Sequence, residues 1–158
     1  MNARLVFALF ALATVAMQVV EAQAPTLKTL KTVQSFKCNF TLVTVGNWDK
    51  TGTPTAETTP AKLTMQFVDI DTQDGTANVI EVSTVAAGAP HIIVRLMGSS
   101  LHFLAMNTSG SVYLTTVFAD KESAASGKFK AAHSRHEFTP VRLSSWTSRP
   151  EQYVGYCE

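Results

Sequence analysis

The sequence predicts an all-β protein, a small antiparallel β-barrel or sandwich closed by one disulfide. Apolar and polar residues alternate with period two in several short runs, and turn-forming Gly, Asp and Pro residues separate these runs. No stretch of useful length shows the apolar period of a helix. About seven to nine strands at such short intervals are typical of a barrel or a sandwich.

The N-terminal residues have the pattern of a secretory signal. Arg4 precedes the apolar run Leu5–Val20, and a small residue follows at Ala22. Because the run is short for a membrane span, the sequence predicts a signal peptide at 1–22, and an uncleaved anchor helix is the alternative. We therefore expect a secreted or periplasmic protein.

The mature chain is predicted to form one domain. A polar leader with a short helical turn is expected at 23–35, and a barrel-like domain at 36–158. Gly46–Pro60 and Leu143–Gln152 are predicted to be loops, the first because it is rich in Thr, Gly and Pro. Alternation predicts strands at Phe36–Val45, Ala61–Ile70, Ala77–Val85, His91–Met97, Lys128–Val141 and Gln152–Cys157.

The clearest local signal is a hairpin over Ser100–Phe118. Its two runs flank a polar break at Asn107–Gly110, and apolar residues such as Leu101, Phe103 and Ala105 share one face of the first run. Alternation interrupted by a short Gly-containing break predicts two antiparallel strands joined by a turn.

The two cysteines, Cys38 and Cys157, lie near the start and the end of the predicted domain. An exported chain meets an oxidising compartment, and only one intramolecular pairing exists, so we expect a Cys38–Cys157 disulfide. It would place the first and last strands side by side, as barrel closure requires. The chain-entropy model gives about 4–5 kcal/mol for closing so long a loop.

The charge of the chain excludes some classes of partner. The formal net charge is +1, so no overall field points to nucleic acid or a membrane surface. Acidic residues gather in Asp49–Glu81 and basic residues in Lys121–Arg142. Both segments are interpreted as solvent-exposed faces, and the alternative is that the basic segment binds an anionic partner.

An acidic segment, Asp69–Gly75, has two interpretations. Alternate carboxylates, a Gly and the distal Glu81 are features of a calcium loop. The spacing between Asp71 and Gly75 is one residue too long for that loop, and a plain Asp-Gly turn between strands explains the same residues. We expect the turn and no metal.

The most concentrated polar cluster is His133-Ser134-Arg135-His136. Three interpretations of this cluster are open: an exposed strand rim, an anion or partner site built on Arg135, or a pair of metal-binding histidines that lacks further ligands. In a strand, His133 and His136 point to opposite faces.

Four aromatic residues elsewhere have two interpretations. They either line a ligand cavity or plug the barrel ends, and they are Trp48, Trp146, Tyr153 and Tyr156.

No motif of a nucleophile, a phosphate-binding loop or a zinc protease occurs in the sequence. We therefore expect a protein without enzymatic turnover and without a cofactor.

Two resemblances add to this interpretation. The mature domain resembles a group of small exported bacterial β-proteins for which no function follows, through Phe36-Lys37-Cys38, Thr108-Ser109-Gly110, Thr115–Phe118, His133–His136 and Gln152–Cys157. Ser109-Gly110-Ser111-Val112-Tyr113 is similar to the hairpin motif of periplasmic C-type lysozyme inhibitors, and Lys121 follows it. That second resemblance implies a small antiparallel barrel that inserts a Ser hydroxyl and a basic side chain into a lysozyme cleft.

We expect an exported, monomeric binding or inhibitory module whose partner is a protein in the periplasm or extracellular space. The alternative is a lipocalin-like carrier of a small apolar ligand. The residues expected to make contact are Ser109, Tyr113, Lys121, His133, Arg135 and His136.

Overall fold

The computed structural model describes residues 25–82, 92–107, 110–120, 126–142 and 145–158. The predicted signal peptide, Ser109 and Lys121 lie outside these ranges. No helix within them is long and apolar enough to cross a bilayer.

The described chain forms a closed antiparallel barrel of eight strands, which confirms the predicted fold class. Each strand pairs with the next, and the last pairs with the first. A helix, α1 (Pro25–Thr32), precedes the barrel. The strands are β1 (Phe36–Trp48), β2 (Pro54–Asp71), β3 (Thr76–Val82), β4 (Ile92–Met97), β5 (Ser100–Met106), β6 (Val112–Phe118), β7 (Phe129–Arg142) and β8 (Ser145–Cys157).

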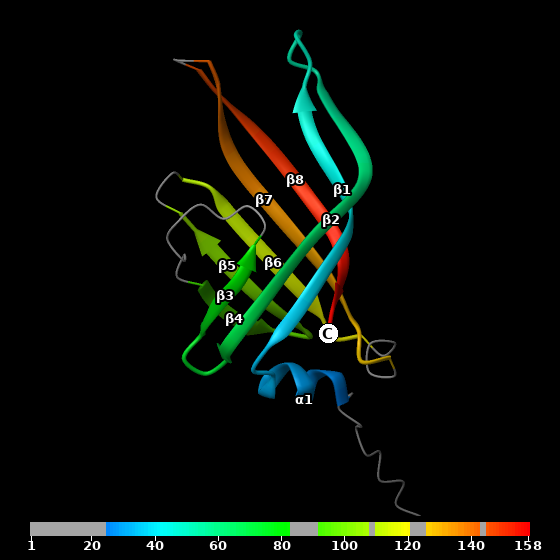
Figure 1. Cartoon of the computed structure of the whole chain (residues 1–158), viewed down its shortest axis with the longest axis vertical. Coiled ribbons are helices and arrows are strands. Elements are labelled where there is room, and N and C mark those ends of the chain that lie inside the picture. Colours follow the sequence, from blue (N-terminus) through cyan, green and yellow to red (C-terminus); the bar gives the residue numbers. More distant parts are fainter. Residues whose placement is uncertain (1–24, 83–91, 108–109, 121–125, 143–144) are drawn as a thin grey trace, which may run out of the picture.

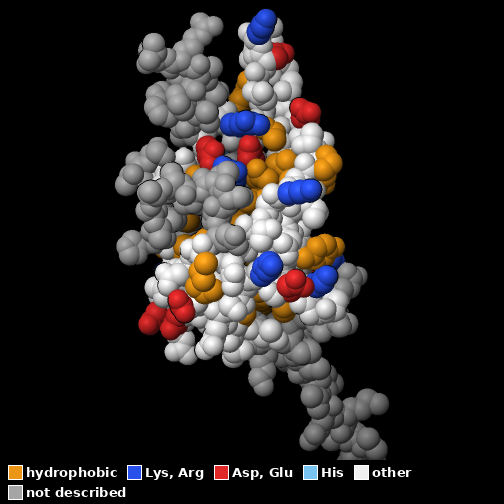
Figure 2. Space-filling model, in the orientation of Figure 1, with side chains coloured by type: hydrophobic (Ala, Val, Ile, Leu, Met, Phe, Trp, Pro, Cys, Tyr) orange, Lys and Arg blue, Asp and Glu red, His pale blue; other side chains and the backbone are white. Residues whose placement is uncertain are grey.

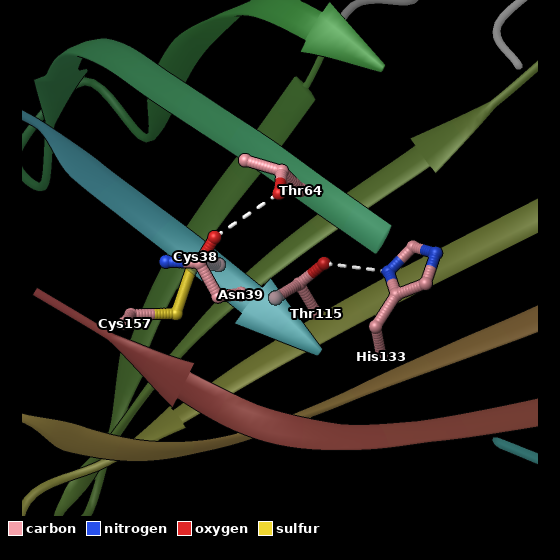
Figure 3. Close-up of a disulfide and its surroundings, with 6 residues drawn as sticks. All are labelled: Cys38, Asn39, Thr64, Thr115, His133 and Cys157. Carbon is pink, nitrogen blue, oxygen red and sulfur yellow. Dashed lines mark hydrogen bonds between the residues drawn. A yellow bond between two sulfur atoms is a disulfide. The ribbon is translucent and has the colours of Figure 1, made fainter. Parts of the chain in front are cut away.

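The predicted disulfide joins β1 to β8. Cys38 and Cys157 are opposite each other in the register, with Cα atoms 3.9 Å apart, and their sulfurs are bonded (Figure 3). Next to this pair, Gly155 lies so close to β1 that a Cβ atom there would contact the Asn39 carbonyl and come within 2.6 Å of the Phe40 Cα. The β1–β8 seam therefore depends on the disulfide and on a residue without a side chain.

Alternate residues of the strands point inward and form an apolar core at one end of the barrel. The rings of Phe67 and Phe103 stack with centroids 4.1 Å apart, and Phe40 is buried nearby. Helix α1 lies across this end (Figure 1), and its Leu30 is fully buried in the core. The leader therefore contributes to the core, and the predicted helical turn extends to a helix of 8 residues.

Two segments predicted to be loops are strands, so those predictions were wrong. Residues 46–48 and 54–60 extend β1 and β2, and β8 already begins at Ser145. The Thr side chains in this region suit strand geometry, Pro54 is the first residue of its strand, and Pro60 lies at a register shift in β1–β2 pairing. Composition alone was misleading because a strand tolerates proline at these two kinds of position.

The longer strands raise one side of the barrel. β1, β2, β7 and β8 have 13, 18, 14 and 13 residues, whereas β3 to β6 have 6 or 7. In Figure 1 the β1–β2 and β7–β8 hairpins rise past the shorter strands at the end opposite α1. We call this end, between the tall strands, the mouth of the barrel.

The hairpin and the acidic turn are as predicted. β5 pairs with β6 from Ser100↔Phe118 to Met106↔Val112. In the β2–β3 turn, the Asp71 carboxylate accepts hydrogen bonds from the backbone N–H groups of Gln73 and Asp74, at 2.7 and 2.8 Å. Gly75 closes the turn with φ 74°. Among the described residues, no group of three or more His, Cys, Asp or Glu is placed to hold a metal ion.

Candidate functional site

The lumen becomes polar toward the mouth. Neighbouring residues on the inner faces of β6, β7 and β8 form rows, because antiparallel pairing places them side by side. From the α1 end upward, successive rows are Val117, Ala131 and Gly155; Thr115, His133 and Tyr153; and Tyr113, Arg135 and Glu151. The lumen thus changes from an apolar row to an ionic and aromatic row over four residues of each strand, from Val117 to Tyr113 on β6.

Arg135 is the centre of this ionic layer. Its guanidinium donates to Glu137 Oε1 and to the Tyr153 hydroxyl, the latter at 3.3 Å, and forms an ion pair with Glu151 at 3.6 Å. The Tyr113 and Tyr153 rings lie 6.0 and 5.9 Å from it. Only 13% of the side chain is exposed. Two carboxylates and two aromatic faces therefore compensate for the desolvation of one buried cation.

Both tyrosines complete the layer through their hydroxyls. Tyr113 donates to Glu137 Oε1 at 3.0 Å, and Tyr153 donates to Glu151 Oε2 at 2.7 Å. Burial and the acceptor carboxylates raise the pKa of each tyrosine. Burial alone would raise the pKa of Glu137, but the hydrogen bond and charge of Arg135 outweigh it and lower that pKa. The pair of Arg135 and Glu137 therefore stays ionised at neutral pH, with both phenols protonated.

One donor of this layer is unused. Arg135 Nε is buried and has no hydrogen-bond partner among the described residues. A buried N–H of a charged group without an acceptor is costly, so it is a site at which an acceptor atom would be stabilising.

His133 lies beneath the layer and is only 2% exposed. Its Nδ1 shares a hydrogen bond of 2.8 Å with the Thr115 hydroxyl (Figure 3), and the rings of Phe40 and Tyr153 lie beside it. Burial, followed by the charge of Arg135, lowers the pKa of His133 to about 4. The interpretation of an exposed rim is therefore wrong for His133, because β7 turns this face toward the lumen.

A pocket of about 590 Å³ lies on the inner side of the mouth. Arg149, one of its residues, donates from Nε to Glu151 Oε1 at 3.2 Å and so joins the pocket to the ionic layer. Figure 2 shows acidic and basic side chains gathered in this upper part of the molecule. The lining residues are Val45, Asn47, Thr55, Ala56, Glu57, Thr59, Ser148 and Arg149.

The structure brings together three of the predicted contact residues, Tyr113, His133 and Arg135. His136 points to the opposite face of β7 and is exposed, as expected from strand geometry. Ser109 and Lys121 lie outside the described residues.

The predicted aromatic set does not form one cavity. Tyr153 faces the lumen, whereas Trp48 and Tyr156 are 47% and 51% exposed. The side chain of Trp146 lies outside the description.

Sequence reasoning missed the pocket residues and the two carboxylates of the ionic layer. Asn47, Thr55 and Glu57 fell in a predicted loop, and the beginning of β8 with Arg149 and Glu151 fell in another. The alternation of Thr55, Glu57 and Thr59 was a usable signal, because it places the three side chains on one face of a strand.

A second hollow, of about 710 Å³, lies on the outer surface over β1, β6, β7 and β8. Four partly exposed apolar side chains contribute to it, Leu42, Phe118, Val154 and Tyr156. Lys130 and Asp120, also in its lining, form an ion pair at 3.1 Å.

No protein-family model matches the sequence, and no match is found among curated proteins. The resemblances to exported bacterial β-proteins and to C-type lysozyme inhibitors therefore stay predictions.

Proposed function

We propose that the protein binds a small molecule in the mouth of its barrel and does so without chemical turnover. The observation that carries the proposal is the pocket of about 590 Å³ that opens beside the ionic layer of Arg135, Glu137 and Glu151. Small-molecule sites commonly have volumes of several hundred Å³ and a few well-placed polar groups.

The placement of the polar groups supports a binding role. Charged side chains are usually kept on the outer surface, because burial costs free energy. Here Arg135 and its partners face the lumen, above a base that Phe40, Phe67 and Phe103 fill. A rigid apolar base and a prearranged polar layer lower the entropy lost when a ligand is held.

The lining favours a polar ligand over the small apolar ligand of the alternative, a lipocalin-like carrier. Hydroxyl, amide, carboxylate and guanidinium groups line the pocket, and Arg135 Nε in the adjoining ionic layer is a buried donor without a described partner. An apolar ligand would cover these groups without satisfying their hydrogen bonds, which costs free energy.

A protein partner remains the other candidate. Tyr113 and Arg135 face the lumen, so a partner could touch them only by inserting a segment through the mouth. The inhibitory role expected from Ser109 and Lys121 stays a prediction, since both lie outside the described residues.

The test is capture of a ligand. The purified protein is dialysed against a low-molecular-weight extract of its source cells, and bound compounds are identified by mass spectrometry after denaturation. We expect one enriched compound, lost in Thr59→Trp, which fills the pocket from the half-buried inner face of β2. Thr58→Trp, on the exposed face of the same strand, is the matched control and should retain it. No enrichment, or equal enrichment in both variants, would contradict the proposal.

A further inference from the structure

The pocket at the mouth contains one carboxylate that has no partner among the described residues. Glu57 lines the pocket from β2, and its carboxylate makes no hydrogen bond or ion pair with any residue that the structure describes. In contrast, Glu137 and Glu151 are each bound to an arginine. Glu57 is therefore available to a ligand.

The described charges that line the pocket and form the ionic layer sum to an excess of one negative charge. Arg135 and Arg149 carry two positive charges, and Glu57, Glu137 and Glu151 carry three negative charges. Asp49 and Lys50 in the β1–β2 turn balance each other, and the Arg142 side chain lies outside the description. The lowered pKa of Glu137 and the raised pKa of Arg135 keep their pair charged near neutral pH. A concave surface with low-dielectric walls concentrates the field of such an excess and attracts cations.

Acceptor atoms surround the free carboxylate. Thr55 and Thr59 lie two residues before and after Glu57 on the same face of β2, so their hydroxyls border it. The side-chain amide of Asn47 lies across from Thr55 on β1. A primary ammonium has three N–H donors and no acceptor, and a carboxylate with neighbouring hydroxyl and amide oxygens matches that donor set.

From this arrangement we propose that the ligand is a small organic cation with a primary ammonium group, which Glu57 holds against β1 and β2. This inference rests on the proposed binding function and specifies its ligand class. Arg149 limits where the cation can lie, because its guanidinium is drawn to Glu151 on β8, whereas Glu57 lies beyond β1 on the opposite side of the pocket. The organic part of the ligand would then fill the space between them.

The experiment is calorimetric titration of the protein at low ionic strength with methylammonium, 1,4-diaminobutane and 2-phenylethylamine. The matched probe 2-phenylethanol replaces the ammonium of 2-phenylethylamine with a hydroxyl. At least one amine should bind, more tightly than the alcohol analogue does, and added salt should weaken that binding. Glu57→Gln should weaken it by about tenfold or more, because a charge-assisted hydrogen bond is lost.

The control for Glu57→Gln is Glu158→Gln, which removes the same charge near α1, at the other end of the barrel. It should leave amine binding unchanged. Failure of all three amines to bind, equal binding of the alcohol, or unchanged binding in Glu57→Gln would overturn the inference.

The ligand class and the proposed binding function can be contradicted independently of each other. A compound captured from the extract that is lost in Thr59→Trp but has no amine would overturn the ligand class and leave the binding function in place. Capture of no compound, together with absence of amine binding, would overturn both.

Discussion

At the scale of single residues, His133 illustrates how the barrel holds a polar side chain in its interior. Its only described polar partner is Thr115, aromatic rings surround the imidazole, and Arg135 lies above it as a positive charge. Burial and that charge both oppose protonation, which explains why the pKa falls rather than rises.

The first prediction concerns the acid sensitivity of folding. The unfolded chain protonates His133 near pH 6.5 and the folded chain only near about 4, so the unfolded state binds more protons between these values. Stability is fully present above the unfolded pKa and falls as pH drops toward 4, by roughly 3 kcal/mol from this group. His133→Gln should reduce the fall in urea-unfolding free energy between pH 7 and pH 4.5.

The exposed His136, on the other face of β7, provides the comparison. His136→Gln should keep the pH dependence of the parent protein. If His133→Gln has the same slope as the parent, carboxylates account for the acid sensitivity and the buried imidazole does not.

At the scale of elements, the β1–β8 seam is the contact that turns a sheet into a barrel. Register shifts occur between Phe40 and Leu42 in both pairings of β1, so β1 bends where β8 is nearest. Gly155 faces this bend, and any Cβ atom would overlap the β1 backbone. Backbone cannot move aside as easily as the end of a flexible side chain.

The second prediction is that Gly155→Ala destabilises the protein by about 2–3 kcal/mol, because overpacking forces the two strands apart. Equilibrium urea unfolding gives the value. Gly52→Ala is the control, since Gly52 has φ 82° but open space around it, and should cost only about 1 kcal/mol. Equal losses at the two sites would show that close approach at the seam is unimportant.

At the scale of the whole molecule, the two ends of the barrel differ in chemistry. Leu30 of α1 and the phenylalanine cluster close one end, and the tall strands carry the ionic layer and the pocket at the other. The two cysteines belong to the apolar core at the closed end and are 119 residues apart in sequence, so the bond between them links the first and last strands of the barrel.

The third prediction is that the double variant Cys38→Ala with Cys157→Ala keeps the β-rich circular dichroism spectrum and loses about 4–5 kcal/mol of unfolding free energy. The spectrum should persist because backbone pairing between β1 and β8 remains. The loss should arise because the crosslink restricts the unfolded chain. Reduction of the parent protein with dithiothreitol should have a similar effect. A loss below about 1 kcal/mol would contradict the entropic role.

Local patterns in the sequence determined most of the elements and the pairing of the two cysteines, and left a barrel and a sandwich as alternatives. Period-two alternation identified the β5–β6 hairpin, Asp71 and Gly75 identified the turn after β2, and two cysteines permitted only one internal disulfide. The hairpin and the turn depend on residues that are neighbours in the sequence, and two cysteines allow only one internal pairing. These features therefore needed no tertiary information. Alternation also placed His133 and His136 on opposite faces of β7.

The tertiary structure alone decided which face of each strand is inside and which side chains meet there. Arg135 is joined by Tyr113 from β6 and by Glu151 and Tyr153 from β8, because register and closure place these strands side by side. Glu57 enters the mouth because β1 and β2 continue through a Thr-rich, Pro-containing segment whose composition favours a loop. The physical reason is that alternation is a local property, whereas burial of a charged face requires partners from several strands at once.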